Sequence, residues 1–504
     1  MSLVNSLSGA VRAKIGKTDA GLFLRIAPLQ GEGGQFVTSY STVSELLDHL
    51  KPAAELRNGS IAVRDEKAFV GDILDRLVYT AVFGDDSVKA AARWIIWQAG
   101  QELGTLPASI HDFYMAGGRD EWRNQTTPAI NVRGMVYDTA RAVVRAAQKN
   151  NSKQFIFEIA RSEMGYTAQR PEEYATVILA AALKEGHRGP VFIQGDHFQI
   201  SAKDYGTDAE KEMSGLRKLI DEALDAGFYN IDIDSSTIVD LSRETVAEQQ
   251  ELNYQRCAEL TAYIRKQQPE GVMVSVGGEI GEVGGKNSTV EDLEAFMNGY
   301  TQAIAAMDGN VVGISKISVQ TGTSHGGVVL PDGSIADVSV DFDTLGELSK
   351  EAREKYHIGG AVQHGASTLP EVAFNRFSEA NACEVHLATG FQNIIYDSVS
   401  FPSDLRDDIY AWLAENRASE RKPNMTDAQF YYTTRKRGFG PFKQQIWDLP
   451  SSTRDAISKE LEEKFDLIFK RLNVVDTADQ IDRFVKPSKR SKPVPEALQK
   501  AAVS

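Results

Sequence analysis

The sequence predicts an α/β protein built around one eightfold (β/α)8 barrel, a TIM barrel, with helical additions at both ends. Three observations support this. Short apolar runs alternate with segments of helical spacing, there are eight such runs, and no glycine-rich phosphate turn follows the first of them. A chain of 504 residues is also long enough for one large barrel with additions.

The eight runs have the length of buried strands, and segments of helix-forming composition separate them. They are Ala129–Val132, Gln154–Ala160, Val191–Asp196, Asn230–Asp234, Val272–Ile280, Val311–Gln320, Gly359–Gln363 and Glu384–Ala388. A doubly wound open sheet is the structural alternative. It usually carries a glycine fingerprint after its first strand, whereas this chain has Arg133-Gly134-Met135-Val136 there.

Helical patterns occur between the runs and in both flanks. Those between the runs include Tyr137–Asn150, Pro171–Glu185 and Glu210–Ala226, and those in the flanks include Val43–Leu50, Lys67–Val82, Val88–Leu103, Asp404–Glu415 and Thr453–Leu472. We therefore expect a helical N-terminal extension over residues 1–125, a barrel domain over 126–400 and a helical C-terminal extension over 401–504. The flanks are interpreted as decoration of the barrel or as an oligomer contact.

Composition excludes several classes of protein. With 55 Lys and Arg against 70 Asp and Glu, the net charge of −15 argues against a general nucleic-acid binder. Two cysteines are too few for a disulfide framework or a cysteine-based metal site. No apolar stretch has the length of a membrane span or of a signal peptide. We expect a cytoplasmic protein with no membrane partner.

Three histidines follow predicted strands three, six and seven. They are His197, His325 and His364, in the segments GDHF, TSHGG and QHGAS. The carboxyl ends of all barrel strands meet at one rim, where barrel active sites are built. Three imidazoles at one point are typical of a catalytic Zn²⁺ site. The sequence therefore predicts one Zn²⁺ per chain, although another divalent metal would fit the same ligands.

Carboxylates stand at neighbouring strand ends. Asp234 closes the fourth run, and Glu279 lies in the fifth. Both are candidates to orient a ligand or to bind the metal themselves, and a buried, paired carboxylate is the alternative. Asp196 directly precedes His197, and a turn of the chain at the strand end would direct both toward the rim. Asp196 is then a candidate acid or base beside the metal.

Glycines and hydroxyls complete the predicted rim. Gly326 and Gly327 follow His325, Gly365-Ala366-Ser367 follows His364, and Thr389-Gly390 ends the eighth run. Barrels commonly bind phosphate with the last strands and the loops after them, through backbone N–H groups and hydroxyls.

The segments GDH, IDIDSS, GGEIGEVGGK, TGTSHG and QHGAS, in this order, resemble the class II metal-dependent fructose-/tagatose-bisphosphate aldolase family. The likeness covers Pro128 to Gln392. It implies an eightfold barrel with Zn²⁺ on three histidines, which match His197, His325 and His364. It also implies an acid/base Asp matching Asp196. The substrate and phosphate contacts that it implies match Asn131, Gly326, Gly365, Ser367 and Thr389.

The resemblance implies a lyase of carbohydrate metabolism, as in glycolysis. Such an enzyme cleaves or forms a C–C bond in a phosphorylated ketose through a metal-stabilised enediolate of dihydroxyacetone phosphate. The implied partners are a small phosphorylated sugar and further copies of the chain in a homo-oligomer.

The chain departs from the family pattern at several points. In the loop that usually supplies a catalytic acid, Asn287 takes the acid's place, with Glu282 or Glu291 as candidate substitutes. Strand eight usually reads Asn-Ile-Asp-Thr-Asp and here reads His386-Leu387-Ala388-Thr389-Gly390. Glu158 and Ala160 stand where the family more often has Gln and Ser. These differences indicate a divergent member whose substrate need not be fructose 1,6-bisphosphate.

Two alternatives to this function remain. The segment from GDHF to ETVAEQ also resembles the non-catalytic accessory subunit of tagatose-bisphosphate aldolase, and another metal-dependent sugar-phosphate enzyme could use the same rim. Two local questions also stay open. His386 is either a packed core residue or a rim residue, and Tyr431–Lys443 is either a surface or subunit contact or a contact to substrate phosphate.

Overall fold

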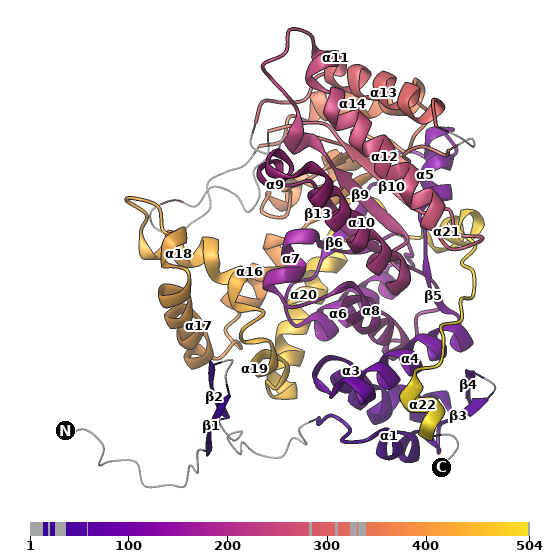
Figure 1. The fold of residues 1–504 in the computed structure, drawn as a ribbon, viewed down its shortest axis with the longest axis vertical. Helices are drawn as coiled ribbons and strands as arrows, with labels where there is room; N and C mark the ends of the chain where they lie inside the picture. Colours follow the sequence, from indigo (N-terminus) through magenta and orange to yellow (C-terminus); the bar gives the residue numbers. More distant parts are fainter. Residues whose placement is uncertain are drawn as a thin grey trace. The chain divides into compact units, whose positions relative to one another are not determined.

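The computed structural model describes residues 14–18, 21–25, 37–57, 59–281, 285–307, 311–322, 330 and 339–501 (Figure 1). The chain divides into two units, Met1–Phe36 and Val37–Ser504. The first unit contains an antiparallel pair of strands, β1 (Lys14–Thr18) and β2 (Gly21–Arg25). The second unit contains the barrel and the helices at both of its ends.

The predicted (β/α)8 barrel is confirmed. Its eight strands are β6 (Thr127–Asn131), β7 (Ile156–Ala160), β8 (Gly189–Gln199), β9 (Asn230–Asp234), β10 (Ser275–Glu279), β11 (Lys316–Val319), β12 (Ala361–Gln363) and β13 (Glu384–Leu387). Neighbouring strands pair in parallel, β13 pairs with β6, and the additional pairing of β8 with β9 closes the sheet. Each of the eight apolar runs in the sequence contains or overlaps one of these strands.

Helices cover the outside of the barrel (Figure 1). The main ones are α6 (Val136–Lys149), α8 (Pro171–Lys184), α10 (Ala209–Ala226), α12 (Glu251–Gln267), α13 (Val290–Ala305), α14 (Phe342–Glu354), α15 (Asn375–Glu379) and α16 (Thr389–Asp397). Every residue of β6, β7, β9 and β10 is buried. Strands packed on both faces in this way read as continuous apolar runs, which explains the sequence pattern.

The N-terminal region also supplies a strand that the sequence analysis did not predict. β5 (Thr105–Ala108) pairs with the first residues of β8, at the amino end of the barrel. Its Pro107 is compatible with this place because β5 is an edge strand with one hydrogen-bonded neighbour. The helix that follows, α5 (His111–Gly118), buries Tyr114, whose hydroxyl donates to Glu384 in β13.

The remaining described parts of the two ends are mainly helical. Before β5 lie α1 (Val43–Leu50), the hairpin of β3 (Ala54–Arg57) and β4 (Ser60–Val63), α2 (Glu66–Ala68), α3 (Leu74–Phe83) and α4 (Asp86–Leu103). After α16 lie α17 (Ser403–Asn416), α18 (Asp427–Thr434), α19 (Lys443–Trp447), α20 (Ser451–Arg471), α21 (Ala478–Phe484) and α22 (Glu496–Ala501).

The two helical ends contact each other as well as the barrel. The indole N–H groups of Trp94 and Trp97 in α4 donate to the carbonyls of Lys492 and Arg490 at 3.1 and 2.7 Å. Arg454 of α20 pairs with the buried Asp138 of α6 at 3.0 Å. These contacts join sequence segments more than 300 residues apart.

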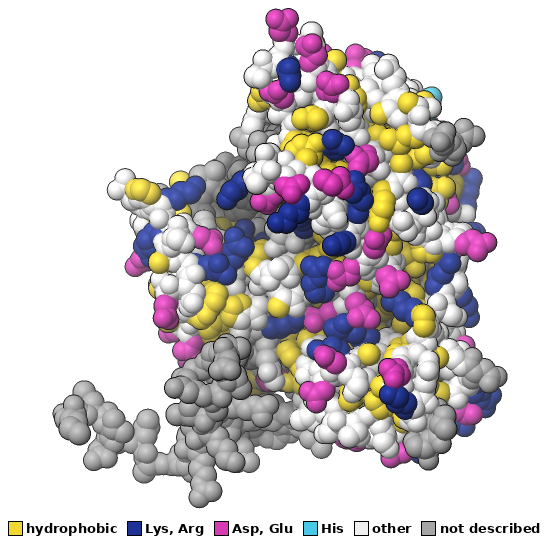
Figure 2. Space-filling view, in the orientation of Figure 1, with side chains coloured by type: hydrophobic (Ala, Val, Ile, Leu, Met, Phe, Trp, Pro, Cys, Tyr) yellow, Lys and Arg dark blue, Asp and Glu magenta, His cyan; other side chains and the backbone are white. Residues whose placement is uncertain are grey.

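Two surface properties bear on the expected partners. No helix in the described ranges is both long and apolar enough to cross a membrane. On the face seen in Figure 2, lysine and arginine side chains are interspersed with aspartate and glutamate among the described residues.

Candidate active site

A pocket of about 620 Å³ lies at the carboxyl ends of the barrel strands. It is lined by nine of the twelve site residues predicted from the sequence: Asn131, Asp196, His197, Asp234, Glu279, His364, Gly365, Ser367 and Thr389. The other three, Glu282, His325 and Gly326, lie outside the described residues. The barrel brings these nine together because the ends of its parallel strands share one rim.

An irregularity in β8 directs both Asp196 and His197 toward the pocket. The strand does not end at Asp196, as the sequence predicted, but continues to Gln199. Its pairing with β9 shifts register between Gly195 and Phe198, and His197 has a φ of 40°. Adjacent residues of a regular strand point to opposite faces, and a bulge of this kind removes that restriction.

His197 contacts two buried carboxylates. Its Nδ1 lies 3.1 Å from Asp234 Oδ2 and 3.2 Å from Glu279 Oε2. Asp234 also accepts hydrogen bonds from Gln199 Nε2 at 2.6 Å and from the Ser236 hydroxyl at 2.7 Å. These contacts fix Asp234 as a partner that orients the imidazole of His197.

Two imidazoles and one carboxylate of the rim form a candidate metal cluster. Ligand atoms of His197, Glu279 and His364 all lie within 4.8 Å of one another. Burial, and then the charge of Asp234, raise the pKa of Glu279 to about 7. Such a shift marks a site where negative charges are crowded and poorly hydrated.

The charges of the barrel interior fit a bound cation. Six carboxylates are buried around the pocket floor: Glu158, Asp196, Asp232, Asp234, Glu279 and Glu384. Among the described residues, Lys316 pairs with Asp232 and Glu384, and the rings of His197 and His386 contact the other four carboxylates. The acidic groups therefore outnumber the basic ones. Buried carboxylates need positive charge nearby, and a divalent cation on His197, Glu279 and His364 would supply it.

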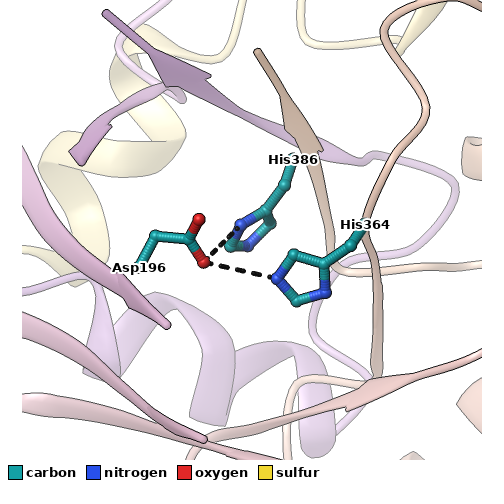
Figure 3. Close-up of side chains that lie close together, drawn as sticks. All are labelled: Asp196, His364 and His386. Carbon is teal, nitrogen blue, oxygen red and sulfur yellow. Dashed lines mark hydrogen bonds and ion pairs between the residues drawn. The ribbon is translucent and has the colours of Figure 1, made fainter. Parts of the chain in front are cut away.

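Asp196 lies between two histidines (Figure 3). Its Oδ1 is 3.4 Å from His364 Nε2 and 3.2 Å from His386 Nδ1. Burial raises the pKa of Asp196, but the charges of His197 and His386 and the hydrogen bonds from His364 and His386 outweigh it and hold the pKa well below its usual range. Asp196 is therefore a buried carboxylate that stays ionised.

The sequence analysis missed a buried polar network beneath the pocket. Lys316 Nζ lies 2.6 Å from Glu384 Oε1, 2.9 Å from Asp232 Oδ2 and 2.8 Å from Gln194 Oε1. This network could have been predicted from the sequence, because its ionisable residues lie inside apolar strands. Charges buried in this way have to be paired.

A second missed cluster lies at the wall formed by β6 and α7 (Arg161–Tyr166). Glu163 accepts hydrogen bonds from Asn131 Nδ2 at 2.6 Å, Arg133 Nε at 2.7 Å and the Ala160 N–H at 2.9 Å. Burial raises the pKa of Glu163, and the charge of Arg133 with these hydrogen bonds lowers it below its usual range overall. Glu163 thus positions the side chains of Asn131 and Arg133 at the pocket.

The C-terminal extension contributes Lys436 to the pocket lining. Lys436 belongs to the short 3₁₀ helix η5 (Arg435–Gly438), in the segment that the sequence left open between a surface contact and a phosphate contact. Burial lowers the pKa of Lys436, and its ammonium nitrogen lies 6.0 Å from the centre of the Tyr166 ring, with no ion pair to any residue that the structure describes. Its ammonium group is therefore available to an anion in the pocket.

Several departures from the expected pattern have definite positions. Glu158, Ala160, His386 and Ala388 all line the pocket, so His386 is a rim residue as well as a buried one. Asn287 Nδ2 donates to Asp341 Oδ2 at 3.1 Å, and Glu291 is exposed in the first turn of α13. Neither Asn287 nor Glu291 lines the pocket as the described residues form it.

The chain is similar to known proteins over most of its length. Residues 122–468 match the model of the family described as fructose-bisphosphate aldolase class-II. Similar solved structures include a putative fructose-1,6-bisphosphate aldolase from Coccidioides immitis, with 17% identity over 73% of this chain and 97% of that one, and a TM-score of 0.41.

Two further solved structures have similar levels of identity. A fructose-bisphosphate aldolase from Campylobacter jejuni is 18% identical over 75% of this chain and 95% of that one, with a TM-score of 0.41. A probable tagatose 6 phosphate kinase from Sinorhizobium meliloti is 16% identical over 75% of this chain and 98% of that one, with a TM-score of 0.47.

Proposed function

Because the chain belongs to the class-II fructose-bisphosphate aldolase family, we propose that it is a Zn²⁺-dependent lyase that cleaves or forms a C–C bond in a phosphorylated ketose. The observation that carries this proposal is the meeting of His197, Glu279, His364 and Asp196 in one pocket at the carboxyl ends of the barrel strands. These groups match the needs of aldol chemistry, which are a site for a cation and a carboxylate for proton transfer.

The metal would be held by His197, His364 and Glu279, with His325 as the further ligand expected from the sequence. When bound, a divalent cation polarises the carbonyl oxygen of the ketose and makes the adjacent C–H and C–C bonds easier to break. Asp234 orients His197 through the contact at 3.1 Å, as outer partners of metal-binding histidines do.

Asp196 is the proton acceptor in the cleavage direction. Cleavage of a ketose removes the proton of the hydroxyl group next to the breaking bond, and the new carbonyl forms at that carbon. An ionised carboxylate is the form that accepts this proton, and the surrounding histidines keep Asp196 ionised. In the condensation direction the same carboxyl group returns the proton to the oxygen of the aldehyde.

The pocket can also bind phosphate at its edge. Gly365 has a φ of 71°, and Ser367 Oγ accepts a hydrogen bond from the Gly390 N–H at the first turn of α16. Lys436 faces the same pocket from the C-terminal extension. A helix N-terminus, a glycine turn and an unpaired ammonium group are together well suited to a phosphate dianion.

The test is an assay of the Zn²⁺-loaded chain with ketose phosphates. We expect cleavage of a ketose 1,6-bisphosphate by the chain alone, loss of activity on chelation and its recovery with Zn²⁺. In deuterated water the protein should also exchange a donor proton of dihydroxyacetone phosphate without any aldehyde present.

A matched pair of variants separates the role of Asp196 from a general effect of charge. Asp196→Asn should lose cleavage by about 10²-fold or more, since general-base catalysis contributes about that much. Asp240→Asn, at a half-buried position after β9 and outside the pocket lining, should behave as the wild type. Zn²⁺-loaded protein that neither cleaves nor condenses any ketose phosphate would overturn the proposal and favour an accessory role.

A further inference from the structure

His386 is an additional imidazole in the pocket, and the predicted ligand set does not include it. It lies in β13 with 4% of its surface exposed, and its ring centroid is 4.1 Å from that of His364. The ring of His364 is in turn 4.2 Å from that of His197. Three imidazoles from β8, β13 and the residue after β12 therefore form one continuous row.

The two ring nitrogens of His386 have different surroundings. Nε2 lies 2.6 Å from Glu384 Oε1, whereas Nδ1 faces Glu158 Oε2 at 2.9 Å and Asp196 Oδ1 at 3.2 Å. Glu384 is itself held by Lys316, Gln194 and Tyr114. Because Glu384 is fixed as an acceptor, it favours a proton on Nε2.

Nδ1 of His386 faces two carboxylates, so a positive charge is needed among the three groups. A proton on Nδ1 supplies that charge where the ring donates to Asp196, and a divalent cation bound at Nδ1 would supply it in the proton's place. The second oxygen of Glu158, Oε1, is buried and has no hydrogen-bond partner among the described residues. Histidines that bind metals commonly donate their other ring N–H to a carboxylate, as His386 does to Glu384.

The spacing of the neighbouring groups also fits a metal ligand set. Atoms of Asp196, His364 and His386 lie within 4.8 Å of one another (Figure 3). The contacts of Asp196 Oδ1 with His364 and His386 measure 3.4 and 3.2 Å. Ligands of a tetrahedral ion with bonds of about 2.0–2.1 Å are separated by about 3.3–3.4 Å.

We propose that His386 is a metal ligand in this chain, binding a divalent cation through Nδ1 together with His364 and Oδ1 of Asp196, which leaves Oδ2 of Asp196 for proton transfer. Glu384 is its outer partner and fixes the tautomer. The metal centre then extends to β13, where the family usually has an asparagine, and it uses a ligand beyond the predicted set of His197, His325 and His364. The proposal concerns metal binding and does not depend on which reaction the site performs.

The test is the Zn²⁺ affinity of the full chain, measured by competition with a chelator of known affinity. His386→Asn places the usual family residue at this position, and we expect it to bind Zn²⁺ about 100-fold more weakly or worse. Loss of an outer partner alone typically costs about 10–100-fold, so a direct ligand should cost at least the upper end of that range. His111→Asn changes a buried histidine outside the pocket and should keep the wild-type affinity.

Two further measurements make the result independent of any folding defect. X-ray absorption at the zinc edge should show one imidazole fewer in His386→Asn than in the wild type. Anomalous scattering from crystals of the Zn²⁺-loaded wild type should place a zinc peak within bonding distance of His386 Nδ1. Unchanged affinity and imidazole number in the variant, or a zinc peak that His386 does not contact, would show that Nδ1 carries a proton instead.

These outcomes are separate from those of the aldolase assay. An active enzyme whose zinc does not contact His386 would overturn this inference and leave the proposed function standing. A zinc-binding His386 in a chain without aldolase activity would do the opposite.

Discussion

The ammonium nitrogen of Lys316 lies 2.6 Å from a carboxylate oxygen of Glu384 in the barrel interior, where neither side chain is exposed to solvent. Asp232 is the second carboxylate on the same ammonium, at 2.9 Å. Glu384 then contacts His386, which contacts Asp196 at the pocket. An ionic layer thus connects the packing of the barrel interior to the groups proposed for chemistry.

Removal of Lys316 should destabilise the protein strongly. Lys316→Met leaves two buried carboxylates without their cation, and breaking a buried ion pair typically costs about 3–5 kcal/mol. Chemical denaturation with urea measures the change in the free energy of unfolding. Lys153→Met is the matched control, because its pair with Asp482 is partly exposed and should contribute about 1 kcal/mol or less. Equal losses in the two variants would contradict the assigned role of Lys316.

Replacement of Asp234 should weaken metal binding without removing a proposed ligand. In Asp234→Asn the carboxylate that orients His197 becomes a neutral amide, and loss of such a partner typically lowers metal affinity by about 10–100-fold. Chelator competition with Zn²⁺ measures the change, and Asp240→Asn serves as the control outside the pocket. Wild-type affinity in Asp234→Asn would mean that Glu279 alone orients the ring.

Loss of Lys436 should weaken substrate binding more than it slows the reaction. A hydrogen bond to a charged group contributes about 1.5–3 kcal/mol, so Lys436→Met should raise KM for a ketose bisphosphate by roughly 10–100-fold. The effect on kcat should be smaller because Lys436 lies on the wall of the pocket and not beside Asp196. Steady-state kinetics of Lys436→Met and of the exposed control Lys422→Met test this, and an unchanged KM would remove Lys436 from the phosphate site.

Acid should destabilise the barrel through His187. Burial is the main cause that lowers the pKa of this histidine to about 4, and its Nε2 contacts the carbonyl of Pro190 at 3.0 Å. The unfolded chain binds a proton at about pH 6.5 whereas the folded one does not until about pH 4. The free energy of unfolding should therefore fall by about 1.4 kcal/mol per pH unit from this group as the pH drops through that window.

The measurement is urea denaturation of the wild type and His187→Gln at pH 7 and pH 5. The difference in stability between the two pH values should be smaller in the variant by about 2 kcal/mol, since Gln takes up no proton. The same pH dependence in both proteins would show that His187 is protonated in the folded state.

The barrel and most of its rim could be predicted from local patterns. Strands buried on both faces produce apolar runs, and polar residues at the ends of such runs stand out against them. This is why Asp234 and Glu279 were found, and why all nine described site residues line one pocket. The position of His386 remained open because a histidine inside an apolar run fits both a packed and a pocket-facing side chain.

Only the tertiary structure decided the contacts between residues that lie far apart in the chain. Lys436 reaches the pocket from the C-terminal extension, β5 joins the sheet from the N-terminal region, and Lys316 pairs with Asp232 and Glu384 across the barrel. The bulge that directs Asp196 and His197 together depends on the register of β8 against β9. Periodicity in sequence records which face of an element is buried, whereas the partner that buries it is selected by packing of the whole chain.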